Sequence, residues 1–355
     1  MASATAGAQE TYENAKIAQK DLTGTARYVG MGGALEALGA DISTMGTNPA
    51  GIGLYKHSAV NVTAGLVSQA NGHDFANGNK TNASFDQGGF VWSTRSGRKS
   101  FLNFGFNYSK SRNLDYILSA SNSVHGGSIS KQSYIKNMLG NVSNGGFSIG
   151  KNEQDEYIGY EDAQSTYTAP NFTQLDYLLW NTFIVDPNNQ SAGYNEANRY
   201  TFDRAHTGYI GEYDFNLSGN INDRIFLGLT FGLYDVHYKG NSTYIENLVD
   251  QQGTNVGTLT LNDNRKITGS GIDLKFGPIF RPIASSPFRF GIYVHTPTWY
   301  DLTTKNYTTL LNGTQLGGYD KGNSYESYDF KIFTPWRFGI SMGHTVGNYL
   351  ALGAT

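Results

Sequence analysis

The sequence predicts an all-β protein, an antiparallel transmembrane β-barrel built from long strands. Three observations predict it: alternating apolar and polar residues, a regular succession of short and long connections, and an unusual composition. The 355-residue chain has 44 glycines, 24 tyrosines and 20 phenylalanines, but only 15% charged residues. Globular proteins carry about 25% charged residues. Few charges with many aromatic residues favour strands of which one face does not meet water.

The N-terminal 57 residues precede the alternating pattern and are predicted to form a separate segment. Its stretch "ALEALGAD" suggests a short helix ended by Gly39, and "TNPAG" suggests a proline turn. The glycines Gly30, Gly32 and Gly33 resemble a phosphate-binding loop, but Leu35 stands where the third glycine of G-x-G-x-x-G is expected. They also do not follow a buried strand, which a dinucleotide site requires. We therefore interpret these glycines as sites of tight turns.

Residues 58–355 are predicted to form the barrel, because apolar residues recur there with period two. "IFLGLTFGLYDV" places Ile225, Leu227, Leu229, Phe231 and Leu233 on one face, opposite small or polar residues. "EYDFNLSGNI", "FLNFGFNYSK" and "WRFGISMG" alternate in the same way. Such alternation indicates strands with one apolar face, which a soluble antiparallel sandwich would show as well.

The connections between the predicted strands distinguish these two folds. Short links such as "RSGRKS", "INDR" and "IASSP" alternate with long segments at about residues 113–207, 241–265 and 303–334. Outer-membrane barrels have short turns at one end and long loops at the other. We count about eight complete strands and a ninth that begins at Tyr349. Since single-chain bacterial barrels have an even number of strands, we expect the chain to be the N-terminal portion of a longer barrel.

The long outer loop predicted at 113–207 contains two segments with apolar residues at helical spacing, "QSYIKNML" and "TQLDYLLWNTFI". Structureless loops of this length are uncommon, so we expect short helices over one end of the barrel. Apolar residues of this region are candidates for a groove that binds a hydrophobic ligand. They are Leu114, Tyr116, Ile117, Leu118, Phe172, Leu175, Leu178, Leu179 and Trp180. The alternative is that these residues only pack loop helices against each other.

Several functional classes find no support in the sequence. The net charge of −3 and the lack of a basic stripe argue against nucleic acid as a partner. The chain has no cysteine, and its seven histidines show no metal-ligand spacing. No Ser, His and Asp arrangement typical of a hydrolase can be defended. We expect no enzyme activity, no cofactor and no metal.

The stretch "GTARYVGMGGALEALGADISTMGTNPAGIGLY" (Gly24 to Tyr55) resembles the N-terminal plug of the FadL/TodX family, outer-membrane channels for long-chain fatty acids and aromatic hydrocarbons. The matching positions are Asp41 and the tripeptide Asn48, Pro49 and Ala50. The resemblance covers about 30 residues well and the rest of the chain loosely. It implies a 14-stranded barrel of which this chain supplies part, with the N-terminal segment closing the lumen.

The resemblance also implies a route for the ligand. Outer loops would capture it, and it would leave sideways beside an inward-kinked third strand. That strand is Phe101 to Lys110 here, with Gly105 as the expected weak point.

Three functional hypotheses follow. The first is a monomeric channel in the outer membrane of a Gram-negative bacterium, in contact with membrane lipid and lipopolysaccharide, for passive uptake of hydrophobic small molecules or lipids. The second is a structural or secretion-associated barrel whose loops bind a protein partner. The third is a soluble β domain.

Overall fold

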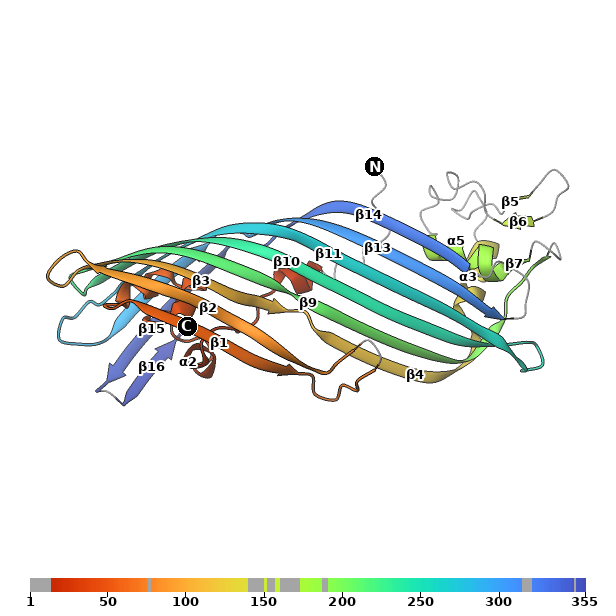
Figure 1. Cartoon of the computed structure of the whole chain (residues 1–355), viewed down its shortest axis with the longest axis horizontal. Coiled ribbons are helices and arrows are strands. Elements are labelled where there is room, and N and C mark those ends of the chain that lie inside the picture. The colour runs from red at the N-terminus through yellow and green to blue at the C-terminus, as the bar shows by residue number, and fades with distance from the viewer. Residues whose placement is uncertain are drawn as a thin grey trace.

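The chain folds around one large antiparallel sheet of 12 strands (Figure 1). The computed structural model describes residues 14–75, 78–139, 150–151, 157–159, 173–186, 191–314, 321–347 and 349–355. The main path of the sheet runs β1-β2-β3-β9-β10-β11-β12-β15-β16, and β4, β13 and β14 pair beside it. No pairing between β1 and β16 is found within the described ranges.

The strands differ greatly in length. β9, β10 and β11 have 26, 25 and 26 residues and run the length of the molecule (Figure 1). The bounds of the strands in the sheet are β1 Ala59–Ser68, β2 Thr81–Arg95, β3 Phe101–Asn113, β4 Tyr116–Gly127, β9 Glu196–Ile221, β10 Ile225–Val249, β11 Asn255–Phe280, β12 Arg289–His295, β13 Trp299–Thr314, β14 Lys321–Phe333, β15 Arg337–Val346 and β16 Leu350–Ala354. Two short pairs lie outside this sheet: β5 Gly150–Lys151 with β6 Tyr157–Gly159, and β7 Val185–Asp186 with β8 Ser191–Ala192.

Some of these strands follow one another along the same neighbour. β3 and β4 pair with successive parts of β9, and β12 and β13 pair with successive parts of β11. Likewise, β14 pairs with β13 while β15 pairs with β12. The main path of the sheet therefore has nine strands, close to the number expected from the sequence. The other three, β4, β13 and β14, lie in line with β3, β12 and β15 and bring the number of strands to 12.

The predicted alternation is confirmed, and it is inverted relative to a soluble sheet. In the first half of β10 the side chains of Ile225, Leu227, Leu229, Phe231 and Leu233 are exposed, and Leu229 keeps 48% of its surface accessible. The opposite face is buried and polar, with Thr230 on β10 and Asn216 and Ser218 on β9. The neighbouring strands have the same exposed apolar face and the same buried polar face. The exposed apolar belt of this half includes Phe215, Leu217, Leu229, Phe231, Leu274, Phe276, Ile292, Phe338 and Ile340.

The other half of the long strands has a different outer face. Beyond Leu233, the outward positions of β10 are Asp235, His237, Lys239 and Asn241. The segments 241–265 and 303–334, predicted as long loops, are mostly strand. β10 and β11 are joined by a tight turn around residues 250–254, and β13 reaches Thr314. The predicted loop 113–207 likewise contains β4 and the first part of β9. These predictions were wrong because polar alternation in an extended ribbon resembles a loop in sequence.

The N-terminal segment forms short helices against the inner face of the sheet (Figure 1). They are α2 Ala26–Gly30, η1 Ile42–Gly46 and η2 Pro49–Leu54. The helix predicted over "ALEALGAD" is wrong: residues 31–38 form successive turns, because Gly32 and Gly33 have φ of +63° and +85° and end α2. Gly39, with φ +60°, ends these turns, whereas it was predicted to end a helix.

A small helical layer lies at the opposite end of the molecule, as predicted from the apolar spacing (Figure 1). It consists of α3 Ile129–Leu139, α5 Gln174–Leu179 and a π-helical turn η4 Trp180–Ile184. The side chains of Leu178, Leu179 and Trp180 are each no more than 2% exposed and pack on Leu248 and Leu259 of the long strands.

Candidate functional site

The tripeptide Asn48-Pro49-Ala50 fixes the N-terminal segment to the wall of the sheet. Asn48 caps η2 by accepting a hydrogen bond from the amide of Ala50 (3.1 Å), and its Nδ2 donates to the carbonyl of Ile292 on β12 (3.3 Å). The carbonyl of Pro49 accepts hydrogen bonds from Asn216 (3.3 Å) and Ser218 (3.0 Å) on β9. Asn48 and Ala50 are fully buried. The tripeptide therefore connects strands that lie far apart in the sequence.

Asp41, the acidic residue singled out with this tripeptide, organises the segment internally. Its carboxylate accepts hydrogen bonds from the amide of Ser43 (3.0 Å), the hydroxyl of Thr25 (2.8 Å) and Nε of Arg27 (3.1 Å). It thereby caps η1 and holds α2 beside it. Tyr28 of α2 is buried against the same turns, and burial raises the pKa of its hydroxyl to about 12. These contacts give the segment a defined fold of its own.

Glycines on the inner face of the sheet permit this close approach. A Cβ added at Gly228 of β10 would lie 2.2 Å from the carbonyl carbon of Pro49, and one at Gly277 of β11 would lie 2.2 Å from Oδ1 of Asn48. Gly105 has the same role, since an added Cβ would lie 2.1 Å from Cε of the buried Met45. The small inner face seen in the sequence is therefore the docking surface of the N-terminal segment.

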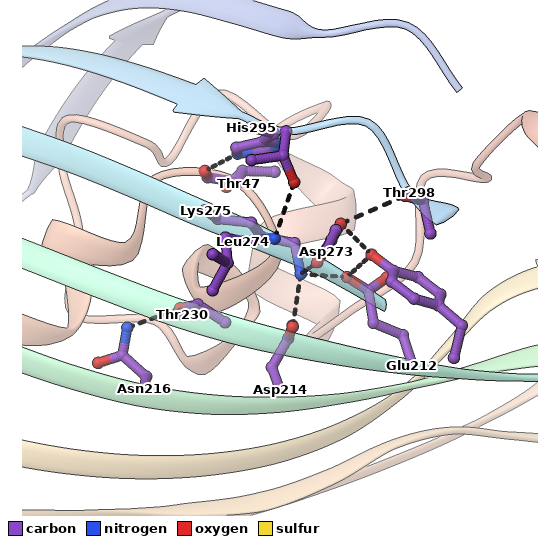
Figure 2. Close-up of polar contacts among 12 residues, drawn as sticks. Thr47, Glu212, Asp214, Asn216, Thr230, Asp273, Leu274, Lys275, His295 and Thr298 are labelled. Carbon is purple, nitrogen blue, oxygen red and sulfur yellow. Dashed lines mark hydrogen bonds and ion pairs between the residues drawn. The ribbon is translucent and has the colours of Figure 1, made fainter. Parts of the chain in front are cut away.

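A buried charge cluster lies on the inner face next to this surface (Figure 2). The ammonium of Lys275 is 2.6 Å from Asp214, 2.8 Å from Glu212 and 3.1 Å from Asp273. Lys20 of the N-terminal segment adds a second ammonium, 2.8 Å from Glu212 and 2.7 Å from the hydroxyl of Tyr234. Isolated charges are costly to bury. The negative charge of Glu212 is therefore fully compensated only when the N-terminal segment is in place and brings Lys20 beside it.

We expect Lys20→Met to lower the free energy of unfolding by about 3 kcal/mol, since Glu212 would lose one of its two cations in a buried site. Urea unfolding followed by tryptophan fluorescence measures this change. Lys56→Met is the control, because Lys56 forms a more exposed pair with Asp223 (2.9 Å) and should cost less than about 1 kcal/mol. Equal losses in the two variants would contradict the role of Lys20.

The wall of the sheet is interrupted between β2 and β3. Their ladder runs from Arg95 and Phe101 only to Gln87 and Ser109, after which β2 continues with β1 alone. β3 continues with β9, with an irregularity between Lys110 and Arg112, and ends at Asn113. Beyond Ser109, β2 therefore no longer supplies ladder hydrogen bonds to β3.

Residues 20–23, here called the N-terminal strap, take over part of this role. The amide of Asp21 donates to the carbonyl of Ser111 (2.9 Å), and the carboxylate of Asp21 accepts from the amide of Asn113 (2.9 Å). The hydroxyl of Thr23 donates to the carbonyl of Lys110 (2.8 Å). Buried backbone groups are costly to leave unpaired, so the strap stabilises the irregular end of β3 from the inner side.

A cavity of about 590 Å³ adjoins this irregular end. Its lining combines apolar and cationic side chains from the strands and from the N-terminal segment. The apolar ones are Ile17, Leu114, Tyr116, Leu118, Tyr238 and Ile267, and the cationic ones are Lys16, Arg112, Arg204 and Arg265. Two carboxylates, Asp115 and Asp263, also line the cavity, so its cations outnumber its acids by four to two. Ligand pockets of this volume are usual in proteins. The mixed lining suits a molecule with an apolar body and an anionic end.

The structure divides the predicted groove residues into three groups. Leu114, Tyr116 and Leu118 line the cavity, whereas Ile117 faces away from it and is covered near Gly72 and Gly78. Leu178, Leu179 and Trp180 belong to the packed helical layer and Leu175 packs against it, which is the alternative considered for them. Phe172 lies outside the described residues.

Gly105 is not the predicted weak point of the third strand. It pairs with Val91 on one side and Asn216 on the other, within regular ladders. The interruption lies further along, at Lys110 to Asp115. Gly105 was misassigned because a strand glycine marks either a bend or a close approach, and here Met45 approaches it.

Sequence reasoning missed Lys20 and the cavity cations. Lys16 and Lys20 stand among acidic residues and Arg27 in the approach to the glycine cluster, so no pattern in the sequence distinguishes them. Arg204 and Arg265 lie on strands in which apolar and polar residues alternate. Whether their side chains point inward depends on the register of those strands.

Within the described part of the chain, no group of three or more His, Asp or Glu side chains is placed to hold a metal ion. Among the helices of the same part, none has the length and apolar character needed to cross a membrane. Comparisons with protein-family models, with curated proteins and with solved structures found no match to this chain.

Proposed function

We propose that the chain forms part of a monomeric outer-membrane β-barrel that takes up hydrophobic compounds passively in a Gram-negative bacterium. The exposed apolar belt supports the membrane location, because lipid-facing strand residues are apolar while lumen-facing ones are polar. The outward apolar stretch of β10, Ile225 to Leu233, has nine residues. A tilted strand needs about 9 to 11 residues to cross the hydrocarbon core.

In this proposal the N-terminal segment is a plug. It packs on the inner faces of β2, β3, β9, β10, β11 and β12, and its contacts leave little open space beside the Asn48-Pro49-Ala50 anchor. A plug lets a barrel select its cargo, because water-soluble molecules are then kept from diffusing through the lumen.

The observation that carries the transport proposal is the position of the cavity. It lies on the inner face and is lined by Arg112 to Tyr116, where β3 ends and β4 begins, just beyond the point at Ser109 where β3 separates from β2. A ligand held there would be next to an interruption of the wall, through which it could leave the barrel sideways. Burial of each CH₂ group contributes about 0.8 kcal/mol, so an apolar cavity can extract such a ligand from water.

The cationic lining points to amphipathic anions such as long-chain carboxylates. We expect the purified protein in non-ionic detergent to bind a fluorescent long-chain fatty acid, and to bind the alcohol of the same chain length more weakly. Leu118→Asp should weaken fatty-acid binding at least about tenfold, since it removes apolar surface and adds a like charge.

Ser121→Asp is the matched control, because Ser121 is exposed on the same strand β4 and does not line the cavity. Equal binding by both variants would contradict the cavity as the ligand site. Absence of any binding by the wild-type protein would favour the second hypothesis, a structural or secretion-associated barrel.

A further inference from the structure

Three lysines form a row across neighbouring strands on the outer face. Lys239 of β10 pairs in register with Lys266 of β11, and Lys266 pairs with Lys305 of β13. All three side chains are exposed. Directly opposed residues on adjacent antiparallel strands have Cβ atoms about 4.5 to 5.5 Å apart, so the three ammonium groups share one small area of surface.

The three lysines outnumber the single acid beside them, Asp329. Like charges directly opposite each other destabilise a sheet, and no carboxylate within the described ranges forms an ion pair with any of the three lysines. The nearest outward acid is Asp329 of β14, which lies diagonal to Lys305 and accepts a hydrogen bond from the hydroxyl of Thr303 (2.6 Å). Two others lie further down the strands and have cationic neighbours of their own. Asp235 is 2.7 Å from His237, and Asp301 is 3.8 Å from Lys331. An external anion would relieve the repulsion within the row.

The height of the row above the apolar belt indicates the kind of anion. On β10 the last outward apolar residue is Leu233, six positions before Lys239. At about 3.4 Å per residue and a tilt of about 40°, the row stands roughly 15 Å above the hydrocarbon region. The polar region of a phospholipid leaflet is only about 5 to 8 Å deep. A glycerophosphate group therefore lies well below the lysines, whereas phosphate on the outer sugars of an oligosaccharide headgroup stands high enough to meet them.

We propose that Lys239, Lys266 and Lys305 bind the phosphate groups of a lipid whose headgroup is a phosphorylated sugar. The inference rests on the proposed membrane location, which places the belt in lipid. Bound on the convex outer face, such a lipid would contact β10, β11 and β13 together, and would stabilise the part of the sheet that rises above the membrane.

The test compares lipid binding by the full chain, purified in non-ionic detergent and titrated with mixed micelles. The probes are a lipid whose oligosaccharide headgroup is phosphorylated on sugars beyond the acylated ones, its dephosphorylated form, and phosphatidylglycerol. We expect the wild-type protein to bind the first at least about tenfold more tightly than the other two. Because each lysine near a charged lipid surface contributes about a fivefold change in affinity, the variant K239Q/K266Q/K305Q should bind it about 100-fold more weakly.

The control variant K80Q/K99Q/K321Q has the same net charge and changes three exposed lysines elsewhere; its affinity should stay within about twofold of wild type. Equal loss in both triple variants, or equal binding of the dephosphorylated lipid, would overturn the proposal. Displacement of the lipid by micromolar free glucosamine phosphate would also overturn it, because the row would then be a site for soluble anions. A wild-type protein that is monodisperse without detergent would refute the membrane location itself.

Discussion

Phe276→Lys is expected to prevent stable insertion of the protein into lipid. Phe276 lies on the outward face of β11, in the middle of the apolar stretch Ile272 to Phe280, and is 45% exposed. A lysine on the lipid-facing side of a barrel costs about 2 to 4 kcal/mol at the bilayer midplane. On a soluble sheet the same change would replace an exposed apolar residue with a charge and would cost little.

The measurement is folding of the full chain into phospholipid vesicles, followed by urea titration. Thr260→Lys is the control on the same strand, since Thr260 lies on the outward face of β11 within the polar half and should tolerate a lysine. If Phe276→Lys folds into vesicles as stably as Thr260→Lys, the exposed apolar belt does not face lipid.

The contrast between these two positions also shows what the sequence could predict. Alternation specifies that Phe276 and Lys275 face opposite sides, because side chains in a strand have a period of two. Composition indicates which side is apolar. Neither property depends on tertiary contacts, which is why the antiparallel sheet and the division of its faces were correctly predicted.

The lengths of the strands could not be predicted in the same way. Residues 241–249 of β10 are polar or alternate weakly, and such residues are typical of loops. They are strand because they continue the ladder begun by the apolar half, with Asn241 paired to Asn264 and Thr243 to Asn262. This is a cooperative property of the ribbon, and no local preference of these residues reveals it.

The candidate site was predicted only in part, for a related reason. Leu114, Tyr116 and Leu118 could be chosen as apolar residues beside a strand end, and they line the cavity. Its other walls come from Lys16 and Ile17 near the N-terminus and from Ile267 on β11. Contacts between residues so distant in sequence depend on where the N-terminal strap lies. The strap is positioned by Asp21 and Lys20, whose partners on β3 and β9 cannot be identified from one sequence.

Gly228→Ala is expected to loosen the whole N-terminal segment. The added methyl would lie 2.2 Å from the carbonyl carbon of Pro49 and 2.4 Å from the amide nitrogen of Ala50, both backbone atoms that no side-chain rotation can move. Overpacking of this kind typically costs about 1 to 3 kcal/mol. The cost falls on the docking of the segment rather than on the ladder, because Gly228 keeps its pairing with Ser218 and Gly277.

Gly219→Ala is the matched control on the neighbouring strand β9. A Cβ at Gly219 meets no other atom within 4 Å, and Gly219 pairs with Leu227, the residue before Gly228. We expect trypsin to cleave the Gly228→Ala variant after Lys20 and Arg27 at least about tenfold faster than the control. Permeability of vesicles to small hydrophilic solutes should rise in parallel, toward the level expected of a variant that lacks Gly24 to Ala50. Faster cleavage without increased permeability would mean that the segment is docked through Pro49 but does not close the lumen. Equal cleavage of both variants would mean that the contact between Pro49 and Gly228 does not hold the segment in place.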